Sequence, residues 1–392
     1  MSRGGRVCVI AAAFVAALAG AARAQSISDL TSDLQTLQAR IAVGDKSAYA
    51  HQTERIRAVG AAIVAAKPET WQSKRETDSV VIYLLSGGDP RDVNRLVESG
   101  AVPASEIPLM RGALAYVMGN EAEAAKRLAD IDPRSLPLRL AGPMAFAQSV
   151  IETGRDPAKA IERLDLARLF APGTLVEEAA LRREVMLVAD QRDLDRLALL
   201  ARQYASRFGA SIYADAFLQG MAGALTKSGA IESEKNLDKL KGFFAALTPD
   251  SRRVFLLGLA RAAILAGRFE VAAKAARAAL DIVAPDSVDE ARGRLYESMA
   301  RILTPEYDDG LAELQSVAQS KLDRRDLELL LAARGVAAYL RDPPVESGAP
   351  APADAAAAAS SNPNDPIAQT ILVAESAIGR TTPLVATPKG SL

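Results

Sequence analysis

The stretch LARAAILAGRFEVAAKAARAALDIVAP, residues 259–285, decides the fold class of this chain. Small apolar residues recur at spacings of three and four on both sides of a Gly-Arg pair: Ala260, Ala263, Ala272, Ala276 and Ala279. Such spacing places small side chains on one face of each helix, so that two antiparallel helices can approach closely. Gly267 supplies the turn between them. The stretch therefore predicts a pair of α-helices.

Turn signals of the same kind recur along most of the chain, at intervals of 31 to 38 residues. We expect turns between paired helices at Gly88-Asp89, Gly119-Asn120, Gly154-Arg155, Gln191-Arg192, Gly229-Ala230, Gly267-Arg268 and Pro305-Glu306. Sustained period-two alternation is hard to find, and the run SVVIYLL (79–85) is interpreted as a buried helix. The predicted fold class is all-α, a right-handed α-solenoid of degenerate tetratricopeptide-like helical hairpins.

The predicted repeats are imperfect and need a covered end. Their later period of 38 residues exceeds the usual 34, and Lys235 and Asn236 stand where small apolar residues are expected. The segment LTSDLQTLQARIAVGD (30–45) is an amphipathic helix that ends at Gly44. We expect it to belong to capping helices at about 27–85, although it could instead pair with a partner helix. The helical repeat domain is predicted to span 25–341.

Composition changes after the repeats. Residues 342–365 are rich in Ala, Pro and Ser, which is typical of a flexible linker. Asp365-Pro366 then predicts the start of a short helix, 366–379, because Asp is a favoured N-cap and Pro a favoured first residue. Residues 380–392 are predicted to form a disordered tail. Whether the short helix packs on the repeats or binds a partner stays open.

The first residues have the features of a secretory signal peptide. Arg3 and Arg6 precede an apolar core at 7–20, and Ala22-Arg23-Ala24 fits the small-x-small cleavage pattern. Cleavage is expected after Ala24, so Gln25 would begin the mature chain. The apolar core is shorter than the about 20 residues that span a bilayer. No later segment reaches that length without charges, so we expect no transmembrane segment in the mature chain.

Charge and cysteine content exclude several classes of function. The chain has 47 basic and 48 acidic residues, and this near-balance argues against a nucleic-acid partner. Its one cysteine, Cys8, lies in the predicted signal peptide. The mature chain would therefore hold no disulfide, thiolate metal site or cysteine nucleophile.

No motif predicts a catalytic, cofactor-binding or metal site. His51 is the only histidine, and a single imidazole cannot build a zinc site, so it is interpreted as a surface residue. The glycine pair in Ser86-Gly87-Gly88-Asp89-Pro90 lacks the lysine of a phosphate-binding loop. A pair of carboxylates in a cleft could serve a glycosidase-like reaction, but a sequence cannot show their separation.

The stretch LARLFAPGTLVEEAALRR (166–183) combines residue types that often build active sites, yet it also reads as a joint between helices. Pro172 and Gly173 stop one helix, and Thr174 with Glu177 forms a capping box, in which Glu177 would return to the amide of Thr174. Glu178 and Arg182 have the spacing of an exposed helix pair: they stand four residues apart. In this interpretation Arg183 has no structural role.

Four blocks of sequence resemble the MotC family of motility proteins from flagellated alphaproteobacteria. The most specific is DPAKAIERLDLARLFAPGTLVEEAALRR (156–183). The others, in the order of the family, are LQTLQARIAVGD (34–45), VVIYLLSGGDP (80–90) and RQYASRFGASIYADAF (202–217). The likeness covers most of residues 30–340, whereas the linker and tail match poorly.

This resemblance implies a non-enzymatic periplasmic protein required for flagellar rotation. It also implies a partner, the stator protein MotB, whose folding, stability or placement family members affect. No catalytic residues are carried over, and the residues that would contact the partner remain unknown. Two alternatives stay open: a peptidoglycan-acting enzyme on a helical scaffold, and a general periplasmic adaptor of tetratricopeptide type with another partner.

Overall fold

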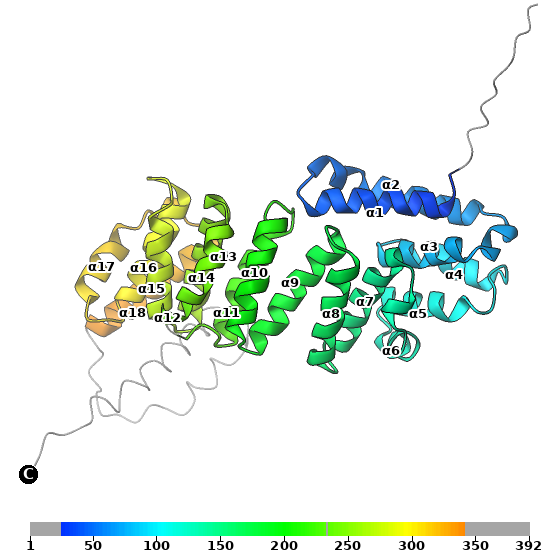
Figure 1. Ribbon diagram of the computed structural model, residues 1–392. Helices are drawn as coiled ribbons and strands as arrows, with labels where there is room; N and C mark the ends of the chain where they lie inside the picture. Colours follow the sequence, from blue (N-terminus) through cyan, green and yellow to red (C-terminus); the bar gives the residue numbers. More distant parts are fainter. Residues whose placement is uncertain (1–24, 233, 342–392) are drawn as a thin grey trace, which may run out of the picture.

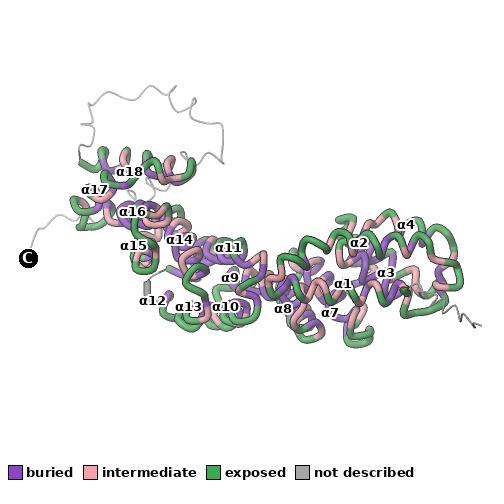
Figure 2. Tube along the Cα trace, turned by 90° about the horizontal axis from the view of Figure 1, so that it is seen from above, coloured by how far each residue is buried: buried purple, intermediate pink, exposed green. Residues whose placement is uncertain are grey.

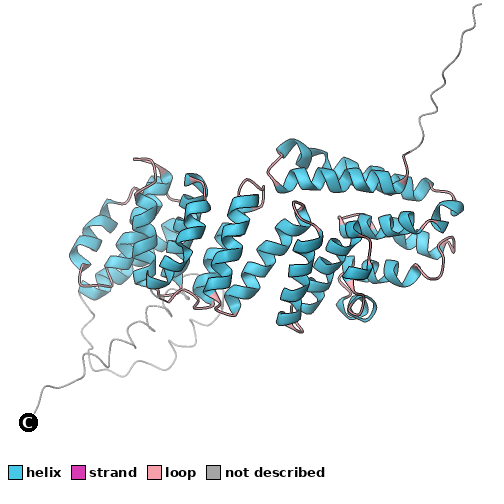
Figure 3. Ribbon diagram, viewed as in Figure 1, coloured by secondary structure: helices cyan, strands magenta, loops and turns pink. Residues whose placement is uncertain are grey.

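The structure, a computed structural model, describes residues 25–232 and 234–341. Within these ranges the chain is built from helices and contains no strand (Figure 3). The predicted all-α fold class is therefore confirmed. The predicted signal peptide with Ala24, the linker at 342–365, the helix at 366–379 and the tail at 380–392 lie outside the described residues.

The helices follow one another along an elongated molecule (Figure 1). They are α1 (Ile27–Ala42), α2 (Lys46–Ala65), η1 (Pro68–Gln72), α3 (Lys74–Leu85), α4 (Pro90–Glu98), α5 (Ile107–Val117), α6 (Glu121–Leu128), η2 (Pro133–Ser135), α7 (Leu138–Glu152), α8 (Pro157–Phe170), α9 (Leu175–Asp190), α10 (Leu194–Phe208), α11 (Ala214–Lys227), α12 (Glu234–Leu237), η3 (Asp238–Leu240), α13 (Lys241–Ala246), α14 (Pro249–Leu265), α15 (Phe269–Leu280), α16 (Val288–Arg301), α17 (Tyr307–Ser316), η4 (Gln319–Lys321) and α18 (Arg324–Arg341).

Each of the seven predicted turns separates two helices. Gly267, for example, lies between α14 and α15 at a φ of 68°, a left-handed conformation that glycine adopts without a Cβ penalty. Arg192 makes the equivalent turn between α9 and α10 at a φ of 59°, although it is not a glycine. The run 79–85 forms the end of α3, with residues 79–84 buried, as predicted.

Successive helices pack on one another, as α7, α8, α9 and α10 do, and again α14, α15, α16 and α17. A line of buried residues runs along the interior of this array (Figure 2). Two large hydrophobic clusters make up most of it, one at 27–151 and one that joins 161–337 with Ala42. A small third cluster connects α7, α8 and α9.

The hairpin of α1 and α2 lies along other helices and connects distant parts of the chain. α1 contacts α3 and also α9, and its amphipathic face buries Leu34 and Ile41 as the sequence predicts. The turn of the hairpin reaches the segment between α10 and α11 (Figure 1). There, a Cβ on Gly44 would stand 2.2 Å from the Ala210 carbonyl oxygen. This position therefore accommodates only glycine.

The unit after Gly229 departs furthest from a regular hairpin, as its sequence suggests. Where a second helix of the pair is expected, the chain forms the short segments α12, η3 and α13. α11 then packs directly against α14.

Candidate functional site

The stretch 166–183, which combines residue types common in active sites, contains the connection between α8 and α9. α8 ends at Phe170, and Gly173 turns the chain at a φ of 76°. Thr174 is the N-cap of α9: its hydroxyl donates to the Ala171 carbonyl at 2.7 Å and accepts from the Glu177 amide at 3.5 Å. These contacts give the polar residues of the helix joint a structural role, which requires no catalytic function.

The capping box differs from the predicted one in its second bond. The Glu177 carboxylate accepts from the amide of Gly173 at 2.6 Å, and not from that of Thr174. The left-handed Gly173 directs its own amide toward the first turn of α9. The other oxygen of Glu177 pairs with Arg207 on α10, so this joint also connects α9 with the next helix.

Glu178 and Arg182 form the predicted pair, but the expectation that it is exposed is wrong, because the Glu178 side chain is fully buried. Its carboxylate accepts from the Tyr204 hydroxyl at 2.8 Å, from the Ser211 hydroxyl at 3.3 Å and from the Arg182 Nε at 2.9 Å. Arg182 in turn stacks over the ring of Tyr213, 4.8 Å from its centre. Glu178 thus joins α9 to α10 and to the segment between α10 and α11.

Six residues further along α9, Glu184 is also fully buried and joins three helices. Arg168 of α8 donates to it at 2.8 Å, and Arg196 of α10 at 2.9 Å. The pKa of the Glu184 carboxyl is raised above its ordinary value, because burial has a larger effect than the nearby charge of Arg168, which lowers it. The sequence carries a signal for this role, because Glu184 follows Leu181 by three residues and precedes Val188 by four on the buried face of the helix.

Arg183, which the sequence left without a role, points to α7. Its Nε and Nη2 donate to the Thr153 hydroxyl at 3.3 and 2.9 Å. The half-buried guanidinium therefore connects α9 with the end of α7.

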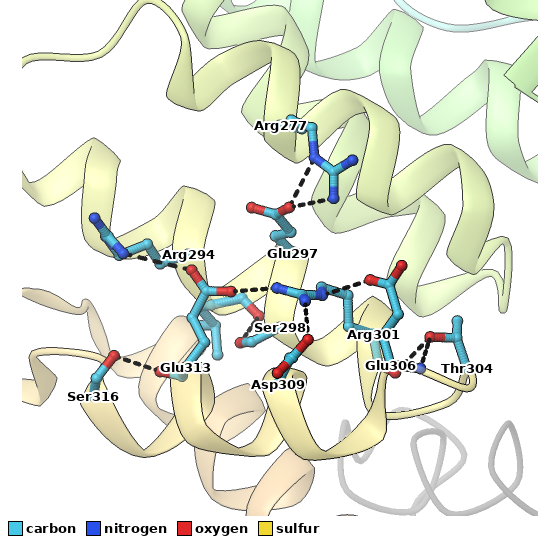
Figure 4. A network of polar contacts seen from close by, with 11 residues as sticks. Arg277, Arg294, Glu297, Ser298, Arg301, Thr304, Glu306, Asp309, Glu313 and Ser316 are labelled. Carbon is cyan, nitrogen blue, oxygen red and sulfur yellow. Dashed lines mark hydrogen bonds and ion pairs between the residues drawn. The ribbon is translucent and has the colours of Figure 1, made fainter.

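A second group of paired charges connects α15, α16 and α17 (Figure 4). Arg301 of α16 contacts Glu306 at 2.9 Å, Asp309 at 3.2 Å and Glu313 at 3.4 Å, all at the start of or within α17. Arg277 of α15 holds Glu297 of α16 at 2.8 Å. Burial and the nearby Glu297 charge raise the pKa of Glu313. Guanidinium groups hold the carboxylates of Glu297 and Glu313, and these ion pairs cross-link neighbouring helices.

The remaining predicted features lie apart from these clusters. His51 is exposed on α2, with its Nδ1 2.7 Å from the Ser47 carbonyl oxygen, as expected of a surface residue. Within residues 25–232 and 234–341, no group of three or more His, Cys, Asp or Glu side chains is placed to hold a metal ion. Among the helices of those same ranges, none has the length and apolar character needed to cross a membrane.

The fold and these clusters define a class: an elongated all-helical protein whose enclosed charges join neighbouring helices. Comparison with known proteins then gives its family. The chain belongs to the family described as Chemotaxis protein MotC, whose model matches residues 2–387. It is similar to the Chemotaxis protein MotC of Rhizobium meliloti (strain 1021), with 28% identity over 357 residues, 88% of this chain and 81% of that protein. No solved structure matches the chain. The resemblance found in the four sequence blocks is thereby confirmed.

Proposed function

We propose that this chain is a non-enzymatic periplasmic scaffold of the flagellar motor, which binds a MotB-like stator subunit and stabilises or positions it. The observation that carries the proposal is membership of a motility family over nearly the whole chain. In this proposal the chain contacts the periplasmic region of the stator subunit, and flagellar rotation depends on that contact.

The succession of helices supports a scaffold role. If the paired helices form a right-handed α-solenoid, their first helices line a continuous concave surface, which is the usual binding surface of such arrays. Guanidinium, hydroxyl and amide groups hold the buried carboxylates of α9 in place. These carboxylates join helices to one another, as expected in a scaffold.

Export places the scaffold beside its partner in this proposal. Residues 1–24 act as a signal peptide, and signal peptidase cleaves between Ala24 and Gln25. Cell fractionation followed by N-terminal sequencing of the mature protein tests this step. A mature chain that begins at Gln25 and is released with the periplasm supports it, and a cytoplasmic chain that retains Met1 refutes it.

Recovery of the stator subunit tests the function itself. We expect the affinity-tagged chain to retain the MotB-like protein from detergent extracts of motile cells. In a deletion strain, swimming and the amount of that protein should both fall, and both should return with the plasmid-borne gene. Normal swimming and unchanged stator levels in the deletion strain would refute the proposal.

A further inference from the structure

α18 is the last helix of the described array, and it is covered on one side. Figure 2 shows it at one end of the array, beside α16 and α17, the two helices against which it mainly packs. Five of its 18 residues are buried. α16, which has α15 on one side and α17 on the other, buries eight of its 14 residues. The other side of α18 therefore faces outward.

This outward side carries an apolar stripe, formed by Leu331, Gly335, Ala338 and Tyr339. Their spacing places them within about 100° of one another around the helix. All four are exposed, Leu331 by 57% and Tyr339 by 50%. The outer face of a terminal unit in a helical array is normally polar, because it meets water. An apolar stripe at this place indicates a surface to which a further element binds.

Gly335 indicates that this element is a helix. The residue lies inside α18, where glycine is less favourable than alanine. A Cβ at this position would meet no atom within 4 Å, so packing among the described residues does not require glycine. The distance between two packed helices depends on the side chains at their contact. Gly335 and Ala338 would let a second helix approach α18 closely, between the larger side chains of Leu331 and Tyr339.

The chain contains a segment of matching character, residues 366–379, which lies outside the described residues. Ile367, Ile371, Ala374 and Ile378 recur in it at spacings of four, three and four, which is typical of one apolar helix face. Its only charged residue is Glu375. Isolated helices shorter than about 12–15 residues are marginal in water, so a segment of this length needs a surface on which to pack.

The sequence between α18 and this segment is long enough to bring the two together. Residues 342–365 number 24, and a flexible chain of that length has a root-mean-square span of about 27 Å. α18 is itself about 27 Å long, so the segment can reach any point of the stripe. Tethering gives it an effective concentration on the order of 1 mM. At micromolar protein concentrations the chain's own segment is therefore favoured over that of a second copy.

We infer that residues 366–379 form a helix that packs on the apolar stripe of α18 and covers this end of the array. The isoleucines of the segment lie beside Gly335 and Ala338, between Leu331 and Tyr339. The inference goes beyond the proposed function, because this contact forms whether or not the chain binds a stator subunit.

Cross-linking tests the contact in the exported full chain. Cys8 is the only cysteine, so in a Cys8→Ala background two introduced cysteines report on a single pair of positions. A short bismaleimide should link Gly335→Cys to Ala374→Cys within one chain. Leu340 is also exposed but lies nine positions after Leu331, on the opposite side of α18, so Leu340→Cys should link poorly to Ala374→Cys. Equal yields for the two pairs would overturn the inference.

Hydrogen exchange tests the packing independently. Amides of residues 366–379 should exchange slowly in the full chain, and about tenfold faster or more in Ile371→Asp, which removes one buried aliphatic side chain. Ser376→Asp adds the same charge on the opposite side of the segment and should exchange like the wild type. Leu331→Asp, on α18, should also accelerate exchange in 366–379 while the amides of α16 stay protected. Fast exchange of 366–379 in the wild type would overturn the inference.

Two further results would assign the stripe or the segment to another occupant and would also overturn the inference. Cross-links that form only between chains, in mixtures of the Gly335→Cys and Ala374→Cys single variants, would identify a second copy of this chain as the occupant. Protection of 366–379 that appears only when the MotB-like protein is added would show that the segment binds a partner. That last result would leave the proposed function intact, so the two proposals can fail separately.

Discussion

The Glu178 carboxylate lies inside the molecule, where the side chains of Tyr204, Ser211 and Arg182 donate hydrogen bonds to it. Truncation to alanine would leave the buried Tyr204 hydroxyl and the half-buried Arg182 guanidinium without this acceptor. Breaking a buried pair on one side is costly because the remaining group stays desolvated. We therefore expect Glu178→Ala to lower the free energy of unfolding by about 3 kcal/mol, measured by urea denaturation.

Two variants serve as controls for this prediction. Glu178→Gln keeps an oxygen acceptor for Tyr204 and should be destabilised less than Glu178→Ala. Glu162→Ala removes an exposed acid from α8 and should change stability by no more than about 0.5 kcal/mol. Equal stability of Glu178→Ala and Glu162→Ala would show that the buried cluster does not hold α9 in place.

Tyr83 provides a test of pH dependence. Its buried hydroxyl donates to Asp92 at 3.1 Å and accepts from the Asp89 amide at 2.9 Å. Burial raises the pKa of Tyr83 from 10.0 to about 12. Since the folded pKa lies above the unfolded one, the stability that the neutral phenol provides is complete below pH 10. It is lost as the pH rises toward 12.

Replacement by phenylalanine should reveal this loss. At neutral pH, Tyr83→Phe should lower the free energy of unfolding by about 1 kcal/mol, because two hydrogen bonds are removed. Between pH 10 and 12 the difference from the wild type should shrink, since the variant has no phenol to ionise. A constant difference across that range in guanidinium denaturation would contradict the raised pKa.

For individual residues, the sequence predicted local contacts well and distant ones poorly. The bond from the Glu177 amide to the Thr174 hydroxyl was predicted, because a capping box depends on residues three apart. The burial of Glu178 was not, since its partners Tyr204 and Ser211 lie 26 and 33 residues away. A charged residue is assigned to the surface unless those distant partners are known.

Among the elements, the hairpin of α1 and α2 has the most distant contacts. Its turn at Gly44 has a φ of 96° and leaves no room for a side chain beside Ala210. Gly44→Val should therefore separate the turn from the segment between α10 and α11. We expect a lower unfolding temperature and faster hydrogen exchange in residues 42–48 and 209–213.

A second glycine isolates the steric part of this effect. Gly100 also has a positive φ, 72°, but a Cβ there would meet no atom within 4 Å. Gly100→Val thus experiences the backbone strain without the clash and should be destabilised less than Gly44→Val. If both variants lose the same stability, the contact with Ala210 contributes nothing measurable.

The elements themselves were largely predictable, while their long-range contacts were not. Small residues and turn glycines encode each hairpin locally, which is why all seven turns were found. For the short segments α12, η3 and α13, the sequence indicated only a departure from the repeat pattern, at Lys235 and Asn236. The contact between Gly44 and Ala210 joins positions far apart in the chain, and no periodicity encodes such a pair.

Across the whole molecule, the two large hydrophobic clusters predict two units of unfolding. Among the described residues, the cluster at 27–151 and the one at 161–337 have no buried residue in common, and in helical arrays stability depends mainly on neighbouring contacts. Native-state hydrogen exchange in low urea should therefore give two groups of opening free energies, divided near α7 and α8. A single opening free energy for all core amides would show that the array unfolds as one unit.

Titration of the purified exported chain with the periplasmic region of the MotB-like stator protein tests the central claim most directly. Isothermal titration calorimetry should show saturable binding, with a dissociation constant of about 10 µM or tighter, as expected for a specific interface. The heat of binding should be observed only when both proteins are folded. No saturable heat at protein concentrations of about 100 µM, with both partners folded by circular dichroism, would contradict the account.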